Sequence, residues 1–273
     1  MQIIILISQN HIYANFLLKK LLLKYPKDII TIVESTTLLS HKTKLQALKK
    51  YLKISGSYYV FVQGIKQNIF NLGSFIIKIL HIKNTFHPFY SYKTLAKKNG
   101  ISILKTSNIN NIKIVKLLKK LEPDVIISAF FNQILNEEIL KIPTLASLNI
   151  HPALLPNYRG VSPVFWCLVN GEEQTGVTIH LISKKIDAGE IINQDIVKIE
   201  PTDTEHSLYK KCTNHILPLL FQTIDQLKNG GLRQEEAKHI HSSYFSLPSK
   251  LAVKKFRTKG KKFFTIMDLF KKF

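Results

Sequence analysis

Short apolar runs of strand length alternate with helical patterns through the first half of the chain, and this alternation limits the folds available to it. We expect strands at Gln2–Ser8, Ile29–Val33, Ile101–Leu104 and Asp124–Ala129, with Tyr58–Val62 as a further candidate. We expect helices at Tyr13–Lys24, Asn68–Ile82, Tyr92–Asn99 and Ile112–Leu121. Strands that alternate with helices build parallel βαβ units. The pattern therefore predicts an α/β fold with a mostly parallel, twisted sheet and helices on both of its faces.

The pattern changes after Ser147. We expect strands at Ser147–Ile150, Thr175–Ile182 and Ile191–Ile199, and helices at Pro163–Asn170 and Thr204–Lys228. Ser162 and Gly171 suit the two ends of the first of these helices, and Pro218 would kink the second. The chain after Leu232 is basic and irregular. We therefore divide it into a main domain, residues 1–231, and a short basic C-terminal extension, residues 232–273.

The formal net charge of +21 raises the question of an anionic partner. Such a charge is typical of proteins that bind nucleic acid, anionic membranes or anionic substrates. Only three of the 39 basic residues are arginines, at positions 159, 233 and 257, whereas specific recognition of phosphates and bases favours arginine. Two interpretations stay open: compositional drift in an AT-biased genome, which we favour, and an anionic partner.

The two cysteines, Cys167 and Cys212, lack the spacing of a metal site or a disulfide framework. They indicate small buried side chains in a reducing compartment. The apolar run Ile3–Ile7 follows no basic leader and is far too short to cross a bilayer. We therefore expect a cytoplasmic protein without a membrane span.

Three segments in the second half of the chain combine polar side chains with sharp turns. Residues 148–160 read Leu-Asn-Ile-His-Pro-Ala-Leu-Leu-Pro-Asn-Tyr-Arg-Gly. Residues 176–180 read Gly-Val-Thr-Ile-His, and residues 186–191 read Ile-Asp-Ala-Gly-Glu-Ile. Ligands of open α/β sheets bind outside the carboxyl ends of the strands. The strand ends at Ala129–Phe131 and Asn149–His151 are therefore the expected site.

Together, these segments resemble the formyltransferase family, whose members use 10-formyltetrahydrofolate. The family pattern is Asn-x-His, then Leu-Leu-Pro, then a Thr-Gly-Val-Thr strand, then an Asp-x-Gly turn, and all four pieces occur here in order. The resemblance is clear over residues 124–230 and vague before residue 91. It implies a Rossmann-like formyltransferase fold with residues 1–231 as the catalytic domain. It also implies 10-formyltetrahydrofolate as co-substrate, and Asn149, His151 and Asp187 as catalytic residues.

The chemistry of formyl transfer suits these three side chains. Acyl transfer to nitrogen passes through a tetrahedral oxyanion and needs a neutral amine, an oxyanion donor and a proton-handling group. Asn149 offers an amide donor, and His151 leaves the same side of an extended strand because it lies two positions further along the chain. A carboxylate at Asp187 beside His151 would orient the imidazole and raise its pKa.

The resemblance implies further contacts. Five residues match the loop that lines the pterin pocket of relatives, largely through backbone groups: Phe131, Asn132, Gln133, Ile134 and Leu135. The turn from Lys184 through Ile186 to Asp187 would form the other wall, and Leu155 with Pro156 would shape the groove. Tyr158 and Arg159 would lie on the substrate rim, with a surface ion pair as the alternative for Arg159.

The acceptor amine is less well defined. Glycinamide ribonucleotide enzymes carry a glycine-rich phosphate loop where this chain has Ser-Gln-Asn-His at residues 8–11. Methionyl-tRNA formyltransferases add a C-terminal barrel, for which residues 232–273 are too few, and usually have Gly in place of Pro152. Amino-sugar enzymes resemble the chain in the Tyr-Arg-Gly of residues 158–160 and in residues 166–172. We expect a small amine, such as a nucleotide-linked amino sugar, and keep tRNA as the alternative.

A remote third possibility is a non-catalytic basic binding protein. The divergent first ninety residues favour it, and the intact Asn-His-Asp set opposes it. His239 and His241 could share one strand face, but no third ligand is evident, so we expect no metal. The sequence leaves the oligomeric state open.

Overall fold

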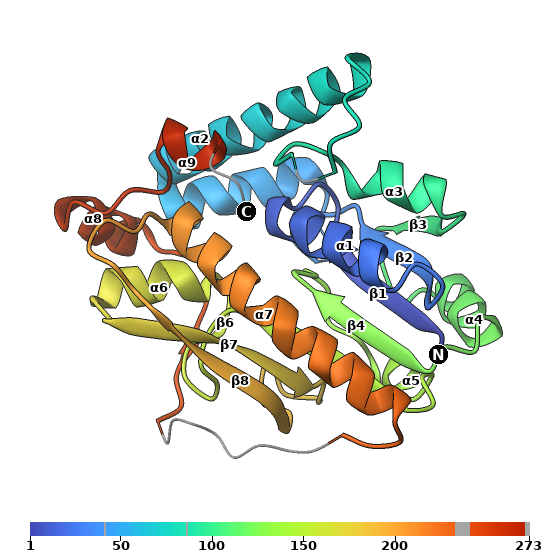
Figure 1. Ribbon diagram of the computed structural model, residues 1–273. Helices are drawn as coiled ribbons and strands as arrows, with labels where there is room; N and C mark the ends of the chain where they lie inside the picture. Colours follow the sequence, from blue (N-terminus) through green and yellow to red (C-terminus); the bar gives the residue numbers. More distant parts are fainter. Residues whose placement is uncertain (41, 86, 233–240, 271–273) are drawn as a thin grey trace.

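The computed structural model describes residues 1–40, 42–85, 87–232 and 241–270, and it confirms the predicted α/β fold (Figure 1). The strands are β1 (Ile3–Ser8), β2 (Ile29–Ser35), β3 (Ser102–Thr106), β4 (Val125–Ala129), β5 (Ala146–His151), β6 (Arg159–Gly160), β7 (Gln174–Leu181), β8 (Ile191–Lys198) and β9 (Tyr244–Phe245). The helices are α1 (Ile12–Lys24), α2 (Lys44–Ile79), α3 (Tyr92–Lys98), α4 (Ile112–Lys120), α5 (Glu137–Leu140), α6 (Pro163–Asn170), α7 (Glu205–Lys228), α8 (Lys250–Thr258) and α9 (Ile266–Phe270).

A central sheet of 7 strands has the order β3-β2-β1-β4-β5-β7-β8. The strands from β3 to β5 are parallel, whereas β7 runs antiparallel to both β5 and β8. The chain first moves outward from β1 to β2 and β3, and then returns to β4 on the other side of β1. Such a reversal opens a crevice at the carboxyl ends of the strands. His151, the last residue of β5, lies at this edge of the sheet.

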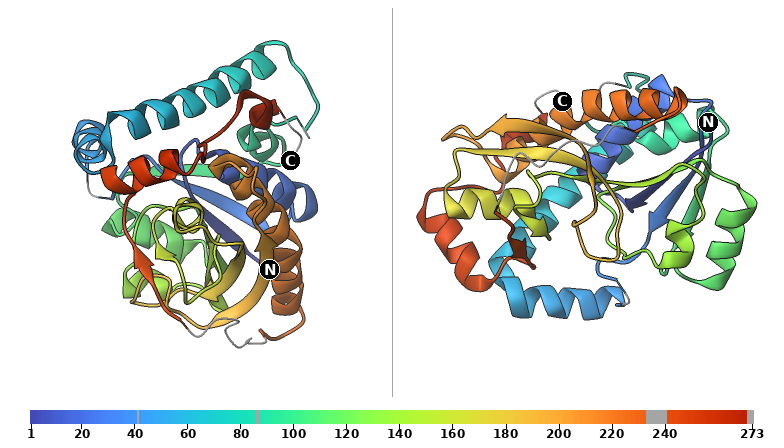
Figure 2. Two further views of the ribbon diagram at one scale, coloured as in Figure 1. Left: turned by 90° about the vertical axis from the view of Figure 1, so that its left-hand side faces the viewer. Right: turned by 90° about the horizontal axis from the view of Figure 1, so that it is seen from below.

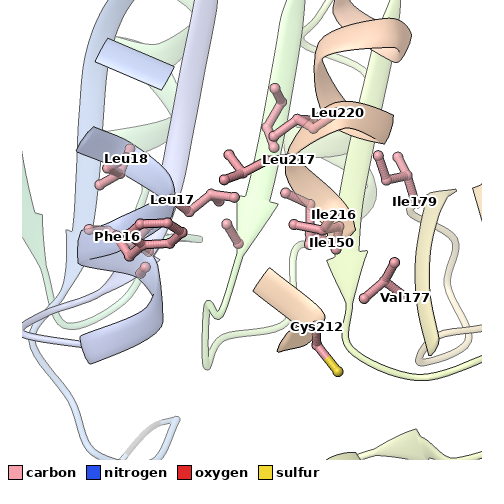
Figure 3. Close-up of a cluster of buried hydrophobic side chains, with 14 of the residues drawn as sticks. Phe16, Leu17, Leu18, Ile150, Val177, Ile179, Cys212, Ile216, Leu217 and Leu220 are labelled. Atoms are coloured by element: carbon pink, nitrogen blue, oxygen red, sulfur yellow. The ribbon is translucent and has the colours of Figure 1, made fainter. Parts of the chain in front are cut away.

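Alternating side chains of β1 divide the core between the two faces of the sheet. Ile3, Ile5 and Ile7 belong to a buried cluster with α1, α3 and α7, whereas Ile4 and Leu6 belong to a second cluster with α4 and α5. Successive side chains of a strand point to opposite faces, so helices cover both sides of the sheet (Figure 2). Figure 3 shows part of the first cluster, where side chains of α1 and α7 meet those of the sheet.

The stretch Tyr58–Val62 is helical, which corrects the prediction of a strand. It lies within α2, whose helical geometry is interrupted at Gly56 by a φ of 86° and a ψ of 166°. A short, dense apolar run fits a buried strand and a helix about equally well. Here the tertiary contacts decide, because Tyr59 packs edge-on against Phe165 of α6 and Phe263.

The C-terminal extension is more regular than its sequence indicated, since it contains β9, α8 and α9. Phe256 and Phe263 are buried in the same cluster as the central sheet. The carbonyls of Lys262 and Phe263 accept hydrogen bonds from the amides of Glu205 and His206, at the start of α7. The first amides of a helix lack partners within the helix, so the extension supplies them. The domain boundary at residue 231 stays a prediction.

Candidate active site

Asn149 and His151 lie at the carboxyl end of β5, on one side of the sheet. Their spacing of two residues gives both side chains the same direction. The neighbouring strand β7 pairs Asn149 with His180 and His151 with Thr178. Directly opposed residues of paired strands share a face of the sheet. His180 therefore joins Asn149 and His151 in one polar group.

Asp187 connects these side chains. Its Oδ1 accepts a hydrogen bond from Nδ2 of Asn149 at 3.2 Å, and its Oδ2 accepts one from the Gly160 amide at 2.8 Å. Nδ1 of His151 lies 3.6 Å from Oδ2, and Nε2 of His180 lies 3.6 Å from Oδ1. The Asp187 side chain is only 11% exposed. The side chains of Asn149 and His151 thus both lie beside the carboxylate of Asp187, although Asp187 belongs to a separate sequence motif.

The Asp-Ala-Gly turn brings this carboxylate back toward β5. Asp187 has a φ of 48°, a left-handed conformation that aspartate adopts more readily than most side chains do. A Cβ atom at Gly189 would lie 1.7 Å from the carbonyl oxygen of Leu181, at the end of β7. Only glycine fits there, so the glycine of the motif lets the turn close against the strand.

His151 is buried, and both of its ring nitrogens face polar groups. Nε2 donates a hydrogen bond to the Tyr158 carbonyl at 2.9 Å, because a carbonyl can only accept. In the neutral ring Nδ1 is then unprotonated, and it faces Asp187. Burial lowers the pKa of His151 below its ordinary value, and this outweighs the raising effect of Asp187. The predicted rise of the pKa is therefore wrong in its net direction.

The Asp187 carboxylate is ionised at neutral pH. Burial alone would raise its pKa, but the positive charges of His151 and His180 in their protonated forms, together with the Gly160 amide, hold the pKa well below its usual range. A proton that reaches Nδ1 of His151 would therefore face a negative charge, which stabilises the imidazolium. Both side chains of the pair are largely shielded from water, with 5% of His151 and 11% of Asp187 exposed.

His180 is a member of the site that the sequence analysis missed. Its Nδ1 donates to the carbonyl of Leu181 at 2.8 Å, so in the neutral ring Nε2 accepts from Nδ2 of Asn149 at 3.1 Å. Both hydrogens of the Asn149 amide are then engaged, one by His180 and one by Asp187. One of them must be released before the amide can donate to a substrate oxygen. The available signal was the alternating run Thr178–His180, which suits a strand beside β5.

The Leu-Leu-Pro loop is held by polar side chains of β7 and β8. Oγ1 of Thr178 donates to the carbonyl of Ala153 at 2.7 Å and accepts from the amide of Leu155 at 3.2 Å. Nε2 of Gln194 donates to the carbonyl of Leu155 at 2.8 Å. The Leu155 side chain is buried. Its expected role in shaping a groove therefore rests on the fixed backbone of the loop, and its own side chain is not presented to a ligand.

The side chain of Tyr158 points inward, and its place on a substrate rim stays a prediction. Its ring is buried and stacks on Phe245 with centroids 5.2 Å apart. Its hydroxyl donates to Glu172 and accepts from Nδ2 of Asn170. These contacts turn the side chain away from the site, and only its carbonyl reaches His151. Arg159 is half-buried, and within the described residues its Nε has no hydrogen-bond partner.

An ion pair connects the two expected walls of a folate pocket. Lys184 Nζ lies 2.5 Å from Oε1 of Glu137, in the helix that follows residues 131–135. Ile134 and Ile186 are exposed, one on each wall, whereas Phe131 and Leu135 pack into the second core cluster. The side chains of Ile134 and Ile186 are therefore accessible to a ligand, whereas those of Phe131 and Leu135 contribute to the core.

Two polar residues of the first wall face inward. Gln133 is buried, donates to Oγ of Ser35 at 2.7 Å and accepts from the amide of Ile109 at 2.7 Å. Nδ2 of Asn132 donates to the carbonyl of Thr37 at 2.5 Å. Oδ1 of Asn132 is buried and has no hydrogen-bond partner in the described part of the chain. The side chain of Gln133 thus connects neighbouring segments of the protein, whereas Oδ1 of Asn132 could still accept a hydrogen bond from a ligand.

Residues 1–40, 42–85, 87–232 and 241–270 contain no group of three or more His, Cys, Asp or Glu side chains that could hold a metal ion. His239, one of the two histidines weighed as metal ligands, lies outside the described residues. Among the helices described, none combines the length and apolar composition that crossing a bilayer requires.

The structure is thus that of an α/β protein in which a largely buried carboxylate lies between an imidazole and an amide, at the carboxyl edge of a Rossmann-like sheet. The chain belongs to the formyl transferase family, whose model matches residues 1–224. The family prediction from the four motif pieces is confirmed.

Three similar proteins illustrate the range of the family. The chain is 45% identical over 157 residues to the bifunctional polymyxin resistance protein ArnA of Wigglesworthia glossinidia brevipalpis, covering 58% of this chain and 24% of that protein. It is 38% identical over 152 residues to methionyl-tRNA formyltransferase of Thermotoga maritima, covering 56% of this chain and 49% of that protein. The chain therefore spans half or less of the length of these two curated relatives. An N-formyltransferase from Helicobacter canadensis, solved with folinic acid and dTDP-3-aminofucose, shares the fold at 21% identity and a TM-score of 0.55, over 90% of this chain and 71% of that chain.

Proposed function

We propose that this protein transfers the formyl group of 10-formyltetrahydrofolate to a primary amine, with Asn149, His151 and Asp187 as catalytic residues. The observation that carries the proposal is the position of Asp187, which contacts the amide of Asn149 and faces Nδ1 of His151. Membership of the formyl transferase family supports the reaction class. The folate in the Helicobacter canadensis structure supports the donor.

Each of the three side chains has a distinct task. Asn149 releases one of its internal hydrogen bonds and donates to the formyl oxygen as negative charge builds there. His151 receives a proton at Nδ1 from the attacking amine and returns one to the departing nitrogen. Asp187 orients the ring and stabilises the imidazolium by its negative charge. His180 holds the amide of Asn149 and so acts as a positioning residue.

The residues between the two walls fit a folate. The pterin ring is rich in hydrogen-bond donors, and Oδ1 of Asn132 is a buried acceptor without a partner in the described residues. Ile134 and Ile186 offer apolar surface for the flat ring. The folate supplies the formyl group when bound, and these residues would orient it toward His151.

Incubation of the purified protein with 10-formyltetrahydrofolate and a panel of amines tests the reaction class directly. We expect release of tetrahydrofolate that depends on one amine, together with a formylated product of that amine. Release at the same rate without any amine would indicate a hydrolase and contradict the proposal.

A small amine, such as a nucleotide-linked amino sugar, is the acceptor that we favour. The N-formyltransferase solved with dTDP-3-aminofucose supports it. Nε of Arg159, buried without a partner within the described residues, would donate to an oxygen of such an acceptor. The second candidate is charged initiator tRNA, which the Thermotoga maritima relative supports.

Variants of the basic extension distinguish between these two candidate acceptors. Lys254, Lys255 and Lys262 are exposed, and replacing all three by Gln leaves the buried aromatic residues of the extension unchanged. With a small acceptor we expect kcat/KM to stay within about threefold of the wild-type value, since the lysines lie outside the reaction. With tRNA, lost phosphate contacts would weaken binding and reduce its salt dependence. Salt-sensitive formylation of initiator tRNA that the Gln variant loses would overturn the small-amine proposal.

Asn149→Ala tests the role of the amide. Because the amide is expected to contact charge that develops only in the transition state, we expect kcat to fall roughly a hundredfold or more. The KM values for folate and amine should change much less. Steady-state kinetics in both substrates measures the two effects separately. A change confined to KM would assign Asn149 to substrate binding.

A further inference from the structure

The second part of α2, residues 57–79, is apolar on two opposite faces. The buried face carries Tyr59, Lys66, Phe70 and Ile77. The exposed face carries Phe61, Ile65, Leu72, Phe75 and Ile79, with Phe61 at 66% and Phe75 at 60% exposure. Each set recurs at intervals of three, four or seven residues, which places it on one side of a helix. A helix with large apolar side chains on two opposite sides normally has both sides covered.

The exposed face of α2 lies on the outside of the molecule. Figure 1 and the left view of Figure 2 both show this part of α2 at the edge of the structure, beyond the sheet and its covering helices. The protein itself covers the opposite face, because Tyr59 packs on Phe165 and Lys66 pairs with Glu205 at 3.4 Å. An apolar stripe of this length on a protein surface marks an interaction site.

The first part of α2, residues 44–55, combines exposed leucines with lysines. Leu45, Leu48 and Leu52 are exposed at spacings of three and four residues. Four exposed lysines accompany them, at positions 44, 49, 50 and 53. Leucines on one stripe with lysines around them are typical of helices that lie in the interface of a membrane. Lysine suits this position because its long stem reaches from apolar surroundings to the polar headgroups.

The charged side chains of α2 itself are all lysines. Between Glu34 and Glu122 the sequence contains lysines but neither aspartate nor glutamate. The helix α8, which carries Lys250, Lys254 and Arg257, lies beside α2, and the Arg257 guanidinium stacks 4.0 Å from the centroid of the Tyr58 ring. The surface formed by α2 and α8 is therefore cationic as well as apolar.

We propose that this surface, α2 together with α8, binds the face of an anionic phospholipid bilayer. A bilayer of this kind offers negative headgroups to the lysines and acyl chains to Phe61, Leu72 and Phe75. A second copy of the chain would place lysine against lysine without a local acid to neutralise them. Nucleic acid would pair with the lysines but leave the apolar stripe in water. The proposal does not depend on formyl transfer.

Co-sedimentation with vesicles tests the proposal. The protein should pellet with equimolar phosphatidylcholine and phosphatidylglycerol vesicles, and much less with phosphatidylcholine alone, because the lysines need negative headgroups. The double variant Phe61→Ser, Phe75→Ser should lose at least about tenfold in affinity, since two aromatic side chains leave the apolar region. The matched control Leu145→Ser, Ile196→Ser changes exposed apolar residues away from α2 and should bind like the wild type. Lys49→Gln with Lys53→Gln should weaken binding and its salt dependence.

Circular dichroism of each variant confirms that the fold is retained, and light scattering without vesicles measures self-association. Equal loss of binding in the Leu145 and Ile196 control would overturn the assignment to α2. A dimer that the Phe61 and Phe75 variant abolishes, with no vesicle binding by the wild type, would make this face an interface between two copies. Binding to tRNA but not to anionic vesicles would also overturn the proposal. Because pelleting is measured without substrates, each outcome is independent of the formyl transfer assay.

Discussion

Asp187→Asn is expected to lower kcat roughly a hundredfold or more, which corresponds to about 2.7 kcal/mol of transition-state free energy. The substitution removes the charge that faces Nδ1 of His151 at 3.6 Å. It also places an amide N–H₂ group among donors, since Asn149 and the Gly160 backbone both donate to the carboxylate. The imidazolium would lose its partner, and the orientation of the ring would no longer be held. Single-turnover kinetics with saturating folate measures this chemical step.

Asp195→Asn is the matched control for this variant. Asp195 also faces a histidine, with Oδ2 at 2.6 Å from Nδ1 of His215, but both side chains are exposed and lie outside the site. We expect kcat within about twofold of the wild-type value, since an exposed pair of this kind contributes little. A hundredfold loss in the control would point to a general effect of charge or stability.

His151→Ala is expected to produce a loss similar to that of Asp187→Asn. In a unit that transfers one proton, removing either partner removes most of the effect. The double variant should therefore be little worse than either single variant. A folded His151→Ala protein with a near wild-type rate would contradict the proposed mechanism.

Much of the sheet, and the grouping of Asn149, His151 and Asp187, could be predicted from the sequence. The apolar run at the start of the chain forms β1, and Pro163 and Gly171 delimit α6 as predicted. Asn149 and His151 were expected to share a side because a strand has a period of two. The approach of Asp187 came from the family resemblance, because no local pattern relates it to a residue 38 positions away.

The remaining features depend on contacts between distant segments. The pKa of His151 follows from burial by several elements, which the neighbouring residues do not reveal. Tyr158 turns inward because its ring stacks on Phe245 and its hydroxyl donates a hydrogen bond to Glu172. His180 enters the site only through the register of β7 against β5. Local pattern thus predicted the elements and the residue types, whereas the protonation state and the orientation of side chains required the fold.

The C-terminal extension gives the largest expected effect on stability. Phe256 of α8 is fully buried and stacks on Phe165 and Phe263, with ring centroids 5.1 and 4.6 Å apart. Removing such a ring leaves a cavity in the core as well as losing apolar burial. Phe256→Ala should therefore lower the free energy of unfolding by about 3–5 kcal/mol. The residue lies beyond position 231, so the effect would show that the extension belongs to the core of the catalytic domain.

Urea denaturation followed by circular dichroism measures this effect, with Leu251→Ala as the matched control. Leu251 lies on the same helix but is 77% exposed, so its truncation should change stability by less than about 0.5 kcal/mol. If Phe256→Ala does not fold, Phe256→Leu keeps most of the volume and should lose about 1 kcal/mol. A wild-type midpoint for both Phe256 variants would mean that α8 is an appendage.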